Sequence, residues 1–138
     1  MEKIKIFLDT NILVDYFSGR MHDGKALRIM QIGRTPQYEL CTSLLSAVNT
    51  VYLKKYFNPD FKPSDIEKIV RIFPHSMDAW RTALKVPVSD FEDCLQITEA
   101  IRYGCAALIT RDRDYHNAPL KVYSPEEFLN LVTTAQKL

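Results

Sequence analysis

Short apolar runs alternate with stretches of helical periodicity along the whole chain. The predicted strands, which are short and mostly apolar, are residues 4–8, 38–42, 105–110 and 120–123. The predicted helices, in which apolar residues recur every three or four positions, are residues 11–17, 25–32, 43–57, 77–85 and 89–103, with two more starting at residues 64 and 124. This alternation predicts an α/β fold, a three-layer sandwich in which helices flank a central, mostly parallel sheet.

Ser-x-x-Glu sequences mark the starts of three predicted helices. In such a capping box, the serine and glutamate side chains each accept a hydrogen bond from the other residue's backbone N–H. The three boxes are Ser64 with Glu67, Ser89 with Glu92, and Ser124 with Glu127. The third is strengthened by Pro125, because proline is favoured at the first position of a helix.

Length and composition are those of one ordinary globular domain. The chain has 138 residues, and neither a linker nor an internal repeat interrupts it, so we expect a single domain over residues 1–138. Hydrophobic residues make up 46% and charged residues 25%, which excludes a wholly disordered chain. The net charge is +1, so any nucleic-acid binding would depend on a local basic patch.

The cysteine and histidine pattern argues against disulfides and zinc. The three cysteines, at positions 41, 94 and 105, form no Cys-x-x-Cys pair, and we expect them to be free and buried. The histidines show no His-Glu-x-x-His spacing. The charged N-terminus precedes no signal-like apolar region, and no apolar run approaches 18 residues, so a cytoplasmic protein with no membrane span is expected.

Acidic residues follow two of the predicted strands. Asp9 comes directly after residues 4–8, and Asp112 and Asp114 come just after residues 105–110. In open parallel sheets, ligands bind at the carboxyl ends of the strands, which favours a shared site. Each aspartate also has a simpler interpretation, as the cap of the next helix or turn.

A third acidic group, Asp90, Glu92 and Asp93, opens a predicted helix. Acids in a first turn favour the helix dipole and need no other function. Asp93, however, lies off the apolar stripe of its helix, and a helix start that faces the strand ends would bring it to the acids there. Clustered carboxylates repel one another unless one is protonated or a cation neutralises them. Oxygen-only ligands favour Mg²⁺ or Mn²⁺, ions suited to phosphodiester hydrolysis.

Five motifs in order give the chain a family resemblance. They are Leu8-Asp9-Thr10-Asn11-Ile12-Leu13, Thr42-Ser43, Asp90-Phe91-Glu92-Asp93-Cys94-Leu95-Gln96, Ile109-Thr110-Arg111-Asp112 and Ser124-Pro125-Glu126-Glu127-Phe128-Leu129. Together they resemble a PIN domain across nearly the whole chain. The resemblance implies a small α/β fold with a Mg²⁺- or Mn²⁺-dependent ribonuclease site. It also implies a VapC-like toxin of a type II toxin–antitoxin pair, a homodimer inhibited by a small antitoxin protein.

The resemblance assigns roles to individual residues. Asp9, Asp93 and Asp112 match the family's catalytic and metal-binding acids, and Asp114 matches a further metal-binding acid. Thr10 and Asn11 would orient Asp9.

Arg111, Arg113, Tyr115 and His116 flank the acids and are candidates for holding RNA phosphates or stacking on bases. Trp80 is expected in the core.

One position departs from the family pattern. The helix after Thr42-Ser43 usually carries a glutamate where this chain has Asn49. Asparagine keeps a carbonyl ligand but loses charge and reach. Three consequences stay open: weaker metal binding, replacement by Asp90, or a degenerate member that binds RNA or protein without cleaving.

A phosphoryl-transfer domain of receiver or haloacid-dehalogenase type is a further alternative, because both use a strand-end aspartate with Mg²⁺. The Asp9-Thr10-Asn11 sequence argues against it, since a second acid does not follow two residues later.

Overall fold

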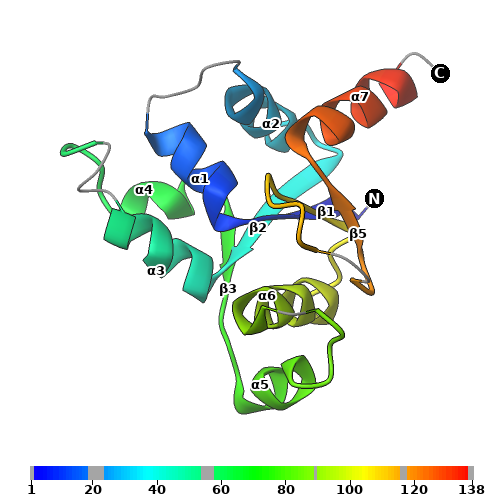
Figure 1. Cartoon of the computed structure of the whole chain (residues 1–138). Coiled ribbons are helices and arrows are strands. Elements are labelled where there is room, and N and C mark those ends of the chain that lie inside the picture. The colour runs from blue at the N-terminus through cyan, green and yellow to red at the C-terminus, as the bar shows by residue number, and fades with distance from the viewer. Residues whose placement is uncertain (1, 19–23, 54–57, 89, 116–117, 137–138) are drawn as a thin grey trace.

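The computed structural model describes residues 2–18, 24–53, 58–88, 90–115 and 118–136. At its centre is a five-stranded sheet in the order β3-β2-β1-β4-β5, and all four strand pairings are parallel (Figure 1). The strands are β1 (Ile4–Leu8), β2 (Tyr38–Ser43), β3 (Arg71–Phe73), β4 (Ala107–Ile109) and β5 (Lys121–Tyr123). The predicted parallel sheet is confirmed, and β3 is an addition that the pattern did not indicate, because its three residues are too short to stand out.

Helices cover both faces of the sheet. They are α1 (Thr10–Phe17), α2 (Lys25–Gly33), α3 (Leu44–Leu53), α4 (Ser64–Glu67), α5 (Met77–Ala83), α6 (Phe91–Arg102) and α7 (Pro125–Gln136). Alternation along β1 explains the two faces: Ile6 and Leu8 pack with α1, α2 and α7, whereas Phe7 packs with α6 on the other side (Figure 1). The predicted three-layer arrangement is therefore confirmed.

The three predicted capping boxes have different outcomes. The box at α7 is confirmed: the Glu127 N–H donates to Ser124 Oγ at 3.1 Å, and the Ser124 N–H donates to Glu127 Oε1 at 2.9 Å. The box at Ser64 is wrong, because α4 is a single turn capped by no side chain. At α6 the cap is the Asp90 side chain instead of Ser89, which lies outside the described residues.

Burial confirms one further expectation and corrects another. Cys41, Cys94 and Cys105 are free and buried, as expected. Trp80 is 47% exposed and meets Phe91 edge-on with ring centroids 4.7 Å apart, so its expected place in the core was wrong. In the part of the chain that the structure describes, no helix is both long and apolar enough to span a membrane.

Strand order determines where a site can form. The chain winds from β1 through β2 to β3, then crosses to β4 on the other side of β1, which makes β1 and β4 the topological switch point. Ligands of open α/β sheets bind outside the carboxyl ends of the strands at this point. The order also excludes the receiver alternative, whose sheet runs 2-1-3-4-5.

Candidate active site

Asp9 lies at the switch point between β1 and β4. Leu8 pairs with Ile109 in the sheet, and the Asp9 N–H continues this pairing by donating to the Ile109 carbonyl at 3.0 Å. The Asp9 side chain then caps α1 by accepting from the Thr10 N–H at 2.7 Å. The capping interpretation of this residue is therefore confirmed, and the cap lies at the edge of the sheet where a site is predicted.

Several donors hold the Asp9 carboxylate in place. The Thr110 hydroxyl donates to Oδ2 at 2.7 Å, and the Tyr115 hydroxyl donates to the same oxygen at 3.3 Å. The Asn11 amide donates to Oδ2 at 3.4 Å. The side chain is only 7% exposed, and this burial raises its pKa despite the hydrogen bonds from Thr110, Thr10 and Tyr115, which lower it. The carboxylate is thus rigidly oriented.

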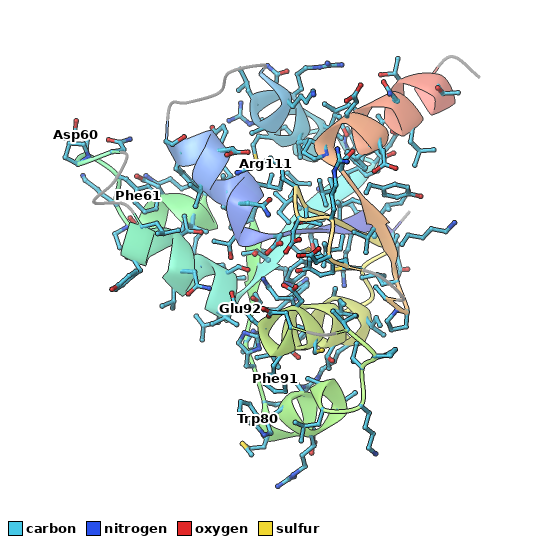
Figure 2. The ribbon with its side chains drawn as sticks, in the orientation of Figure 1. Asp60, Phe61, Trp80, Phe91, Glu92 and Arg111 are labelled. Carbon is cyan, nitrogen blue, oxygen red and sulfur yellow. The ribbon has the colours of Figure 1, made fainter. Side chains whose placement is uncertain are left out.

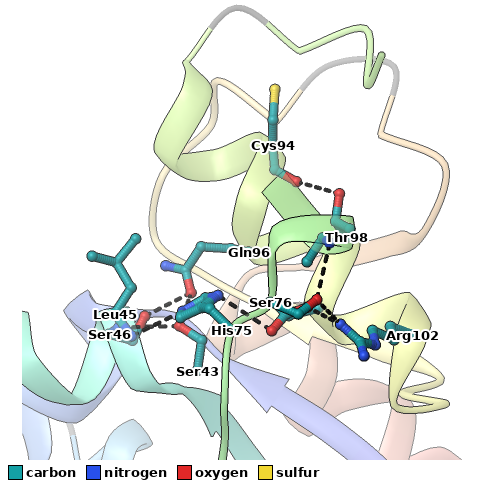
Figure 3. A network of polar contacts seen from close by, with 11 residues as sticks. Ser43, Leu45, Ser46, His75, Ser76, Cys94, Gln96, Thr98 and Arg102 are labelled. Carbon is teal, nitrogen blue, oxygen red and sulfur yellow. Dashed lines mark hydrogen bonds and ion pairs between the residues drawn. The ribbon is translucent and has the colours of Figure 1, made fainter. Parts of the chain in front are cut away.

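Gln96 of α6 supplies the donor to the other Asp9 oxygen, at 2.9 Å from Nε2 to Oδ1. Its own carbonyl accepts from the Ser43 hydroxyl at 2.8 Å and from the Ser46 hydroxyl at 2.7 Å (Figure 3). Because both serines donate to Oε1, the NH₂ group must face Asp9. Sequence reasoning missed this role, although Gln96 is three positions after Asp93 and so lies near it on one helix face.

Asp93 lies in the first turn of α6 and faces the same place. Its N–H donates to the capping Asp90 carboxylate at 3.1 Å, and its side chain, 9% exposed, is hydrogen-bonded to Tyr115. Burial, together with the charges of Asp90, Asp9 and Asp112, raises the pKa of Asp93 to about 6, against the hydrogen bond from Tyr115. The acids are close enough to perturb one another.

The turn after β4 carries Asp112. Its N–H donates to the Thr110 hydroxyl at 3.0 Å, and its Oδ1 accepts from the Asp114 N–H at 2.9 Å. Asn11 also connects to this turn, since its amide donates to Thr110 Oγ1 at 3.0 Å and its Oδ1 accepts from the Arg111 N–H at 3.1 Å. Asn11 therefore connects Asp9 to the turn after β4, and Thr110, whose role the sequence analysis left out, contacts both residues.

One pocket collects most of the predicted acids. Its lining includes Asp9, Asp90, Glu92, Asp93 and Asp112. Carboxylate oxygens are the donors that Mg²⁺ and Mn²⁺ prefer, so the donor set fits such an ion chemically. Among the described residues, however, no three acidic, histidine or cysteine side chains already surround one point as ligands. The pocket therefore has the type of oxygen donor that such an ion prefers, but the described side chains are not arranged around a single point.

A family model described as a PIN domain matches residues 5–114. The chain belongs to the PIN domain family. The resemblance predicted from the five motifs is confirmed, and the haloacid-dehalogenase alternative is set aside with it.

This PIN domain is similar to proteins described as VapC or as part of a toxin–antitoxin complex. Ribonuclease VapC1 of Aquifex aeolicus (strain VF5) is 26% identical over 137 residues, which cover 93% of this chain and 95% of that protein. A chain in a toxin–antitoxin complex from Klebsiella pneumoniae is 25% identical, with a TM-score of 0.67 over 87% of this chain and 97% of that one. VapC20 of Mycobacterium tuberculosis, a sarcin–ricin loop cleaving toxin, shares the fold at 18% identity, with a TM-score of 0.61 over 83% of this chain and 95% of that one.

The remaining candidate residues of this PIN domain differ in whether they line the acidic pocket. Asp114 is exposed, does not line the acidic pocket, and contacts Asp112 through its backbone. Arg111 lines the pocket and forms a two-point ion pair with Asp15, at 2.6 Å and 3.0 Å. Arg113 lines an adjoining groove. Arg111 and Asp112 line both this groove and the acidic pocket.

Tyr115 and His116 complete the set of predicted RNA contacts. The expectation that Tyr115 stacks on bases is wrong, because its side chain is 7% exposed and its hydroxyl is directed at Asp9. Burial and the charges of Asp9 and Asp93 raise the pKa of Tyr115 well above its usual value, so its hydroxyl remains a donor to these acids. His116 lies outside the described residues.

Asn49, the position that departs from the family pattern, faces Glu92. Its amide donates to Glu92 Oε1 at 2.8 Å, and Figure 2 shows Glu92 at the end of α6 that lies near α3. Asn49 itself does not line the pocket.

Proposed function

We propose that this chain is a divalent-metal-dependent endoribonuclease that hydrolyses RNA phosphodiester bonds, and that it is the toxin of a type II toxin–antitoxin pair. The observation that carries the proposal is the meeting of Asp9, Asp93 and Asp112 in one pocket at the switch point of the sheet. Support also comes from the similarity to a protein named as a ribonuclease.

In this proposal Asp9, Asp93 and Asp112 hold Mg²⁺ or Mn²⁺. A bound ion supplies an activated water and stabilises the charge that develops on the phosphate. The chain's own contribution is to fix the carboxylates: Thr110 and Gln96 each hold one oxygen of Asp9. Because the pKa of Asp93 is about 6, this group is mostly ionised at neutral pH and available as a ligand.

Arginine side chains at the pocket edge are the proposed contacts for the RNA backbone. Arg111 lines both the acidic pocket and the adjoining groove, and Arg113 lines that groove as well. Arginine pairs readily with phosphate oxygens, and such contacts position a strand without reading its sequence. Asp112 lines the same pocket and groove, so a strand held by these two residues would lie near a proposed metal ligand.

The proposed partners are an antitoxin and a second copy of the chain. Related chains occur in structures described as toxin–antitoxin complexes. Exposed apolar side chains lie on two helices of this chain: Leu44, Val48 and Tyr52 on α3, and Met77 and Trp80 on α5, with Leu84 directly after α5. Contiguous exposed apolar surface is characteristic of protein–protein contacts.

The test is cleavage of an end-labelled single-stranded RNA by the purified chain, free of partner, with Mn²⁺. We expect cleavage that is abolished by EDTA and reduced by about 1,000-fold in an Asp9→Asn variant that remains folded, since this change removes a central charge at little steric cost. Cleavage by folded Asp9→Asn would contradict the assigned site. Absence of cleavage by the wild-type chain would favour a binding module that has lost activity.

A further inference from the structure

The contact between α3 and α6 has a regular polar pattern. Ser46 of α3 donates to Gln96 of α6 at 2.7 Å, and Asn49 of α3 donates to Glu92 of α6 at 2.8 Å. On each helix the two residues are three or four positions apart, so they lie on one face. In both pairs a donor on α3 fixes the orientation of a longer side chain on α6.

The two pairs serve the same region. Gln96, once oriented by the serines, donates to Asp9, and Glu92 lines the pocket to which Asp9 belongs. Asn49 holds only Oε1 of Glu92, and the described residues form no other hydrogen bond with this carboxylate. Glu92 is therefore directed at the pocket while keeping an oxygen for a ligand.

The charges around Glu92 also identify it as a member of the acidic group. No lysine, arginine or histidine among the described residues forms an ion pair with it, and its acidic neighbours in the pocket are Asp9, Asp90, Asp93 and Asp112. A carboxylate used only to join two helices would gain nothing from such neighbours. A cation shared with Asp9 would remove their repulsion.

Asp90, whose replacement of the usual glutamate is one of the three open consequences of Asn49, has a role in the helix itself. Its Oδ1 accepts from the Asp93 N–H at 3.1 Å and so caps α6. The described part of α3, Leu44–Leu53, contains no acid of its own. Among the described residues, Glu92 is therefore the acid of the pocket that a side chain of α3 holds.

We propose that Glu92 is a further carboxylate of the metal site, and that Asn49 is a positioning residue that aims it from α3. The inference rests on the proposed function, because it assigns these residues to the same metal site. In this arrangement the carboxylate is on α6 instead of α3, and the Asn49 amide on α3 holds it by a hydrogen bond.

The test measures Mn²⁺ binding by calorimetry, which is independent of RNA cleavage. We expect Glu92→Gln to weaken binding about 10–100-fold and Asn49→Ala to weaken it about 10-fold, the range typical of residues that hold or orient metal ligands. Glu67→Gln, a matched loss of one carboxylate on α4 away from the pocket, should leave binding unchanged. The exchange variant Asn49→Glu/Glu92→Gln swaps acid and amide across the 2.8 Å contact and should recover most of the affinity.

The outcomes separate this inference from the proposed function. Near-wild-type Mn²⁺ binding by Glu92→Gln, alongside lost binding by Asp9→Asn, would overturn the role of Glu92 alone. Failure of the wild-type chain to bind Mn²⁺ would overturn both proposals. Failure of the exchange variant to recover affinity, with its unfolding midpoint unchanged, would overturn the positioning role of Asn49. If Glu92→Gln does not fold, Glu92→Asp replaces it, and equal binding by that shorter acid would count against the proposal.

Discussion

Asp93 combines burial with nearby negative charge, and this combination couples the chemistry of the site to stability. Its pKa rises from an unfolded value near 3.8 to about 6 in the fold. The folded chain therefore binds more protons than the unfolded chain between these values, and the contribution of Asp93 to stability falls as pH rises through this window. Above pH 6, Asp93 is ionised in both the folded and the unfolded chain, and its full unfavourable contribution to the stability of the fold is present.

We expect Asp93→Asn to raise the free energy of unfolding at pH 7.5 by up to about 3 kcal/mol, because it removes a charge that is unfavourable in the fold. At pH 4 the gain should be much smaller, since Asp93 is then protonated in the folded chain. Urea unfolding at both pH values measures this difference, with Asp78→Asn on exposed α5 as the control. A gain that is equal at both pH values would contradict the assigned pKa.

Other single residues show what sequence alone could and could not predict. Asp9, Asp93 and Asp112 could be nominated because each follows a strand or opens a helix, where parallel sheets form their sites. The role of Gln96 could not, because it depends on two serines contributed by another segment. Tyr115 was misjudged for a similar reason: only the packed fold shows that its ring is buried.

Among the elements, the helix starts depend on local contacts that a capping motif represents only in part. Ser124 and Glu127 form both reciprocal hydrogen bonds of the box, and these bonds also lower the pKa of Glu127. Ser64 has the same motif but already lies inside α4, after Pro63, so its side chain caps nothing. At α6, Asp90 supplies the cap and Glu92 turns instead toward Asn49.

These differences predict that two matched substitutions will have unequal effects on stability. Ser124→Ala should lower the free energy of unfolding by about 1 kcal/mol, because it leaves the Glu127 N–H without its cap. Ser64→Ala should change it by less than about 0.5 kcal/mol, as is usual for a surface position without a special contact. Urea unfolding of the two variants side by side is the measurement, and equal losses would show that α4 is capped after all.

For the whole molecule, the fold class could be predicted because apolar runs and helical periodicity alternate so regularly. Strand order could not, and the site depends on it: Asp9 meets Thr110 and Asp112 only because β4 pairs with β1. The short β3, at the edge beside β2, could not be predicted either. Its three residues, Arg71–Phe73, show no strand pattern of their own, and their pairing with β2 is what makes them a strand.

Exposed apolar side chains on α3 bear on the proposed assembly. Leu44, Val48 and Tyr52 follow one another at intervals of four, so they lie on one face, and Val48 is 55% exposed at its middle. If this face joins two copies, Val48→Lys should convert a dimer into a monomer in light scattering, whereas Gln31→Lys on α2 should not. A monomeric wild-type chain, or a dimer that survives Val48→Lys, would contradict this surface.

The central claim is that carboxylates at the switch point use a divalent ion to direct water at an RNA phosphate. Its most direct test is the end chemistry of the cleavage products formed with Mn²⁺. Attack by water leaves no 2′,3′-cyclic phosphate and does not need the neighbouring 2′-hydroxyl, so a substrate with 2′-deoxyribose at the cleaved position should still be cut. Cyclic phosphate ends, formed equally well in EDTA, would show that the 2′-hydroxyl is the nucleophile and that the acidic pocket does not catalyse the reaction as proposed.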